Sequence, residues 1–70
     1  MTAHSHLIGR YKKQIADDNQ TIKAAISDGV RYLEGSGNSP MVDITDKRVA
    51  KAIERIELMK ELIRIAEADN

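Results

Sequence analysis

The feature that most constrains the fold is a single break in an otherwise periodic sequence. Residues 35–40 (GSGNSP) are turn formers and include the only proline of the chain. On either side of this break, apolar residues recur every three, four or seven positions, which is the spacing of one face of an α-helix. The pattern predicts two helices joined by a short loop, and such neighbours pack antiparallel by default.

The first helix is predicted over residues 5–34 and the loop over residues 35–44. Gly35 is expected to end this helix as a left-handed residue. Gly9 and Gly29 lie inside the predicted helix, and each costs about 1 kcal/mol relative to alanine. The apolar stripe of this segment consists of Ile8, Tyr11, Ile15, Ile22, Ile26, Val30 and Leu33.

The second helix is predicted over residues 45–68. Thr45 is the expected N-cap, with Asp43 as a competing cap. Residues 40–42 are expected to be briefly extended but too few to form a sheet. The stripe of this helix consists of Val49, Ala52, Ile53, Ile56, Met59, Ile63 and Ala66, and the residues Leu58, Leu62 and Ile65 lie beside it.

The absence of Cys, Phe and Trp leaves aliphatic residues to build the core. A single core in a chain of 70 residues rarely supplies more than about 3–5 kcal/mol without a disulfide, a metal or a partner. The sequence therefore predicts one all-α domain over residues 1–70, an antiparallel two-helix hairpin that dimerises into a four-helix bundle. The expected self-association interface consists of Ile8, Tyr11, Ile15, Ile22, Leu58, Met59, Leu62, Ile63 and Ile65.

Asp18 occupies a position between Ile15 and Ile22 where an apolar residue is expected. The antiparallel register, which pairs Ile26 with Ile53 and Leu33 with Val49, brings Asp18 near Lys60. An ion pair between Asp18 and Lys60 adds little net stability but helps to fix register or partner choice.

No residues match a known pattern for catalysis or metal binding. His4 and His6 lie about 200° apart on a helix and lack a nearby third ligand. No serine stands in a nucleophile motif, and the carboxylates Asp17, Asp18, Glu57 and Glu61 lack the Glu-x-x-His pairs of bundle metal centres. We therefore expect no enzyme activity, no cofactor and no metal.

One face of the second helix is basic, because Arg48, Lys51 and Arg55 are three and four residues apart. Eleven basic residues balance eleven acidic ones, so the chain lacks the overall field that drives non-specific binding to nucleic acid. The favoured function is a cytoplasmic, non-enzymatic helical module that self-associates and binds an unidentified protein partner, with no membrane association. The alternative is a small nucleic-acid-binding regulator that uses Arg48, Lys51 and Arg55.

Overall fold

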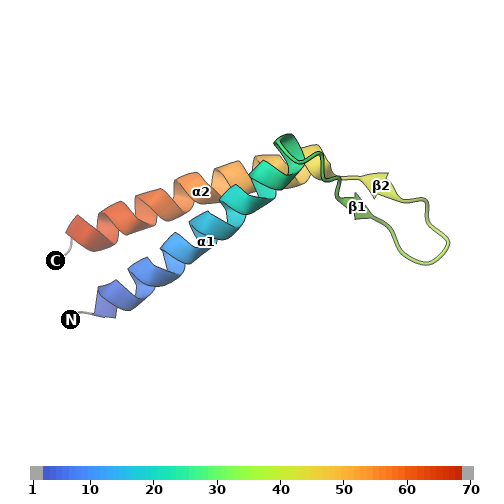
Figure 1. Cartoon of the computed structure of the whole chain (residues 1–70). Helices are drawn as coiled ribbons and strands as arrows, with labels where there is room; N and C mark the ends of the chain where they lie inside the picture. The colour runs from blue at the N-terminus through green and yellow to red at the C-terminus, as the bar shows by residue number, and fades with distance from the viewer. Residues whose placement is uncertain (1–2, 69–70) are drawn as a thin grey trace.

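The computed structural model describes residues 3–68, with two helices packed antiparallel and a small β-hairpin in the segment that connects them (Figure 1). The elements in chain order are α1 (Ala3–Ile26), β1 (Leu33–Glu34), β2 (Val42–Asp43) and α2 (Thr45–Ala68). The β-hairpin projects beyond the end where the helices are joined, and the opposite ends of α1 and α2 lie together (Figure 1). The molecule is consequently elongated, with extents of 51 × 27 × 16 Å. The predicted helical hairpin is confirmed.

The first helix ends at Ile26 and not at Glu34, so its predicted C-terminal boundary was wrong. The amides of Ser27 and Asp28 both donate to the carbonyl of Lys23, at 2.8 and 3.3 Å, which closes the last turn. Gly29 then adopts a φ of 70°, in the left-handed region that favours glycine. Gly29 therefore lies just beyond the end of α1, and the chain leaves the helix axis at this residue.

The predicted loop over residues 35–44 contains the turn of a β-hairpin, so the all-α prediction missed a small sheet. β1 and β2 pair antiparallel, with Leu33 opposite Asp43 and Glu34 opposite Val42. Gly35 does not adopt the left-handed conformation predicted for it, but an added Cβ would lie only 3.1 Å from the carbonyl oxygen of Pro40. Glycine thus allows the two strands to approach closely where they enter the turn.

The second helix coincides with its predicted range, but Thr45 does not act as its N-cap. Oδ1 of Asp43 accepts a hydrogen bond from the amide of Thr45 at 2.9 Å, so the competing residue Asp43 caps the helix. The hydroxyl of Thr45 instead accepts the amide of Tyr32 at 2.8 Å, and the carbonyl of Tyr32 accepts the amide of Ile44 at 2.8 Å. Thr45 is buried, and these bonds join the base of the β-hairpin to the start of α2.

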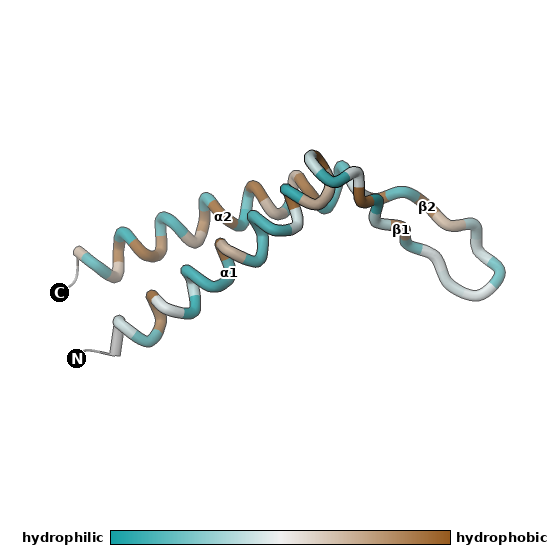
Figure 2. Tube along the Cα trace, viewed as in Figure 1, coloured by the Kyte–Doolittle hydropathy of each residue, from teal (hydrophilic) through white to brown (hydrophobic). Residues whose placement is uncertain are grey.

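The core between the helices is small. Within residues 5–68, the buried apolar side chains are Ala25, Ala52, Ile56 and Ala66. Larger apolar side chains remain in contact with solvent: Ile26 is 70% exposed and Ile53 is 46% exposed. Apolar positions recur along both helices, and others lie in the β-hairpin (Figure 2). One copy of the chain therefore covers only part of its own apolar surface.

Candidate functional site

A buried ion pair crosses between the two helices at Asp18, which is 2% exposed. Arg55 donates from Nε to Oδ2 at 2.9 Å and from Nη2 to Oδ1 at 2.7 Å, and Gln14 adds a bond of 3.3 Å to Oδ1. The hydrogen bond from Arg55 lowers the pKa of Asp18 despite the burial, which by itself would raise it. Asp18 is therefore a paired carboxylate in the helix interface.

Arg55, and not the predicted Lys60, is the partner of Asp18. The prediction assumed that α1 runs as far as Glu34, which would place Asp18 level with Lys60. Because α1 ends at Ile26, each residue of α1 lies level with a residue of α2 that comes earlier in the chain than the one predicted. Asp18 accordingly lies level with Arg55 and not with Lys60. Leu33, predicted to contact Val49, consequently lies in β1 opposite Asp43. Lys60 is exposed.

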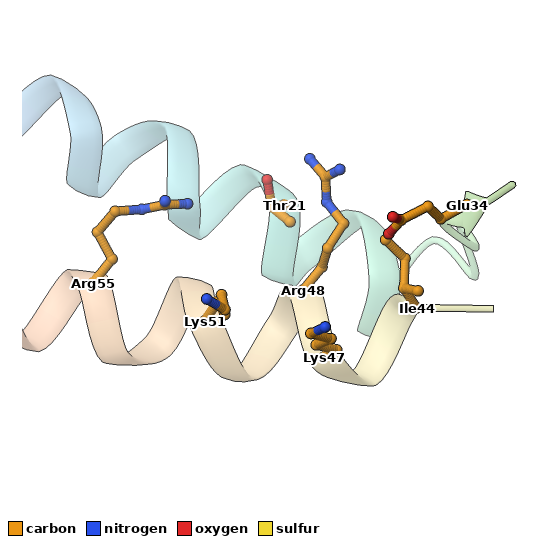
Figure 3. Close-up of a pocket in the computed structure, with 7 residues that line it drawn as sticks. All are labelled: Thr21, Glu34, Ile44, Lys47, Arg48, Lys51 and Arg55. Atoms are coloured by element: carbon orange, nitrogen blue, oxygen red, sulfur yellow. The ribbon is translucent and has the colours of Figure 1, made fainter. Parts of the chain in front are cut away.

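The three predicted basic residues share one groove, which we call the basic groove (Figure 3). It has a volume of about 280 Å³ and lies between the two helices next to the base of the β-hairpin. Lys47, at the start of α2, joins the predicted residues. The lining of the basic groove consists of Thr21, Glu34, Ile44, Lys47, Arg48, Lys51 and Arg55.

Part of the positive charge of the basic groove is already engaged within the chain. The guanidinium of Arg55 binds Asp18, and that of Arg48 lies over the ring of Tyr32, 4.6 Å from its centroid. Lys47 and Lys51 line the groove from α2 (Figure 3) and form no ion pair with another residue that the structure describes. The groove therefore offers two available ammonium groups beside a stacked guanidinium, with Glu34 at its edge.

The base of the β-hairpin carries a second, exposed ion pair. Nη2 of Arg31 lies 2.8 Å from Oδ2 of Asp43. The hydroxyl and amide of Thr45, followed by Arg31, lower the pKa of Asp43 from 3.8 to about 2. The carboxylate of Asp43 therefore caps α2 and binds Arg31, which lies two residues before β1.

An apolar groove of about 320 Å³ lies on the other side of the helix pair. Ile53 lines this apolar groove and Lys51 lines the basic groove; residues two apart on a helix point about 200° away from each other. Ile26 and Val49 complete its apolar floor near the β-hairpin. The full lining is Ala25, Ile26, Arg31, Thr45, Asp46, Val49, Ala50 and Ile53.

The residues predicted to form the self-association interface are all at least partly accessible in the single chain. Leu58 and Ile65 are exposed, at 53% and 51%. The half-buried members are Ile8, Tyr11, Ile15, Ile22, Met59, Leu62 and Ile63. Ile26, Val49 and Ile53 were not part of that prediction, because the predicted register paired Ile26 with Ile53 and Val49 with Leu33.

The structure places no metal-binding or membrane-spanning element among the residues that it describes. No three His, Cys, Asp or Glu side chains in this part of the chain are arranged to hold a metal ion. His6 is exposed on α1, and the side chain of His4 lies outside the described residues. Neither helix, within its described bounds, is long and apolar enough to cross a membrane.

Comparison with protein-family models, with curated proteins and with solved structures finds no match to this chain.

Proposed function

We propose that this protein is a non-enzymatic helical interaction module that acts by self-association, with its remaining surface available to a protein partner. The observation that carries the proposal is the imbalance between a very small core and the large apolar side chains left outside it. Ile56 is the one large apolar side chain that is buried within residues 5–68, whereas Ile26, Ile53, Leu58 and Ile65 are each at least 46% exposed.

The energetics of burial favour a second copy of the chain as the partner. Covering a fully exposed isoleucine or leucine contributes roughly 1.5–3 kcal/mol. A core of this size supplies only about 3–5 kcal/mol by itself. Burying even a few of these side chains between two copies would therefore stabilise the fold by an amount comparable with the core of one copy.

Thermal unfolding at different protein concentrations tests this proposal. Because only the folded chain associates, the Tm of a self-associating protein rises with concentration. We expect circular-dichroism melts over a hundredfold concentration range to show this rise, and Ile26→Gln to abolish most of it. Leu7→Gln is the matched control, because Leu7 is 38% exposed but lies outside the apolar groove. A Tm that does not change with concentration would contradict the proposal.

A nucleic-acid-binding regulator is the second candidate function, and the basic groove is the observation that favours it. Lys47, Arg48 and Lys51 of α2 all line the basic groove (Figure 3). Fluorescence anisotropy with labelled duplex DNA tests this candidate, because log K falls by about 0.9 per phosphate contact for each tenfold rise in salt. Lys51→Gln should weaken such binding and reduce the salt dependence, whereas Lys13→Gln, on α1, should not. Absence of binding at low salt would exclude the candidate.

A further inference from the structure

We propose that two copies pack through their apolar grooves about a twofold axis parallel to the helices, so that both β-hairpins lie at the same end of the dimer. This inference rests on the self-association proposed above and adds the orientation of the partner. The alternative twofold axis, perpendicular to the helices, would place the two β-hairpins at opposite ends. Both arrangements give a four-helix bundle. The distribution of apolar and charged residues on the surface of the helix pair decides which of the two is favoured.

The apolar groove occupies only one end of its face, near the β-hairpin. Ile26 is the last residue of α1, and Ile53 lies in the first half of α2 (Figure 1). The same side of α2 continues beyond Ile53 with Glu57, Lys60 and Arg64, each three or four residues after the one before it. All three are exposed. The face is therefore apolar toward the β-hairpin and charged toward the termini.

This gradient favours the same-end arrangement. When both β-hairpins lie at one end, the apolar groove of each copy faces the apolar groove of the other. With the β-hairpins at opposite ends of a bundle whose helices overlap along their full length, Ile26 and Ile53 would face the charged half of the partner, and Glu57 and Arg64 would lose water without gaining an apolar contact. Burying charges in that way is unfavourable unless they are paired.

The charges that border this face favour the same arrangement. On α1 the border carries Lys12 and Lys23, which are eleven residues, or about three turns, apart. On α2 the corresponding border carries Glu54, Glu57 and Glu61, of which Glu61 is also bound by Arg64 of its own chain. All five border residues are exposed.

The Asp18–Arg55 pair sets which of these border residues lie level with each other. In the same register, Lys23 lies level with residue 50, one turn from Glu54, and Lys12 lies level with Glu61. A twofold axis parallel to the helices places α1 of one copy beside α2 of the other, which brings basic borders to acidic ones. The perpendicular axis places α1 beside α1 and α2 beside α2, which brings like charges together.

The same-end arrangement also gathers apolar side chains of the two β-hairpins. Leu33, Met41 and Val42 are 54%, 60% and 58% exposed in the single chain. Leu33, opposite Asp43, and Val42, opposite Glu34, lie on opposite faces of the β-hairpin. Each copy would therefore turn one of these two faces toward its counterpart at one end of the dimer. The bundle would then have one end that carries both β-hairpins and one end where α1 begins and α2 ends in each copy.

A distance measurement between spin labels tests the orientation. The chain contains no cysteine, so Asn38→Cys provides a unique attachment site in the turn of the β-hairpin. The same-end dimer predicts a distance below about 30 Å, because packed helix layers lie only about 10 Å apart. The opposite-end dimer predicts a distance greater than the 51 Å length of one chain. Ala16→Cys, near the middle of α1, is the control, since its label pair should give a short distance in either dimer.

A charge exchange provides the second measurement. Lys23→Glu should raise the dimer dissociation constant by about fivefold, as expected for loss of the two symmetry-related exposed ion pairs. Adding Glu54→Lys should restore the wild-type constant. A dimer with the Ala16 distance short and the Asn38 distance long would overturn this inference and leave the proposed function intact. A monomer, with no distance at either site, would overturn both.

Discussion

Arg55 of α2 binds both carboxylate oxygens of Asp18 of α1, across a separation of 37 residues in the chain. Asp18 is buried, whereas the side chain of Arg55 is 49% exposed. The pair therefore combines a carboxylate that has lost its water with a guanidinium that has kept much of its own. It also marks how far α1 and α2 are shifted along each other, because Arg55 lies level with Asp18.

Removing either member of this pair should destabilise the protein, and by unequal amounts. Arg55→Met leaves the carboxylate of Asp18 buried without its main partner, which costs about 1–3 kcal/mol. Asp18→Ala should cost less, because Arg55 can turn toward solvent. The double variant should recover much of the loss, as replacement of both members of a buried pair often does.

Urea unfolding of the two single variants and the double variant measures this coupling. Lys60→Met is the control, and it should change the free energy of unfolding by no more than about 0.5 kcal/mol. Additive effects of Asp18→Ala and Arg55→Met, or a large effect of Lys60→Met, would contradict the observed pairing.

The hydroxyl of Thr45 should be important for the junction between the β-hairpin and α2. Thr45→Val preserves the shape of the side chain but removes the acceptor for the Tyr32 amide. Leaving that partly buried amide unsatisfied should cost about 1–3 kcal/mol. Hydrogen exchange should show loss of protection at the Tyr32 amide. Thr21→Val is the matched control, because the Thr21 hydroxyl donates only to a carbonyl of its own helix, and equal effects of the two variants would argue against the junction.

Stability should fall in acid. The pKa of Asp18 and the pKa of Asp43 are both lowered by folding, and that of Asp43 falls from 3.8 to about 2. A carboxylate with a lowered pKa in the folded state contributes stability above its unfolded pKa and loses it as pH falls toward the folded value. The free energy of unfolding should therefore decrease between pH 3.8 and about 2. Asp43→Asn should reduce this decrease in urea titrations, and a rise in stability on acidification would contradict the prediction.

Two glycines that look equivalent in sequence should respond oppositely to alanine. Gly9 lies within α1 with nothing near an added Cβ, so Gly9→Ala should stabilise the protein by about 0.5–1 kcal/mol. Gly29 has a φ of 70°, so Gly29→Ala should destabilise it by about 1 kcal/mol through strain at a left-handed position. Thermal unfolding of the two variants checks the contrast, which would fail if both changes had the same sign.

The turn of the β-hairpin should tolerate insertion. Two glycines added after Gly37 lengthen a turn that lies beyond the paired residues Glu34 and Val42. Loop-closure entropy grows slowly with length, so the cost should stay below about 1 kcal/mol. A loss of more than about 2 kcal/mol in urea unfolding would indicate that the turn packs against another surface, since ordinary surface changes are much smaller.

Local signals made α2 predictable from the sequence at both ends. Asp43 and Thr45 precede a run of apolar residues at helical spacing, and no glycine or proline interrupts it. The end of α1 was not predicted, because Val30 and Leu33 continue the helical spacing past Gly29. Ser27, Asp28 and Gly29 together form a turn signal, and in the structure this signal outweighs the periodicity.

The candidate sites were predictable only where they depend on one helix. Arg48, Lys51 and Arg55 share a groove because their spacing places them on one side of α2 whatever the rest of the chain does. The partner of Asp18 and the apolar groove depend instead on how α1 and α2 are shifted relative to each other. That shift is set by the path of residues 27–44, which connect the two helices. Part of this segment pairs as the strands β1 and β2, and the helical periodicity of α1 and α2 does not predict that pairing.

Sedimentation equilibrium at micromolar concentration is the most direct test of self-association, because it measures mass without reference to a partner or a label. The proposed module should sediment at twice the 7.8 kDa mass of the chain, and Ile26→Gln should shift it toward a single chain. A wild-type protein that sediments at 7.8 kDa and still unfolds cooperatively would contradict the proposal.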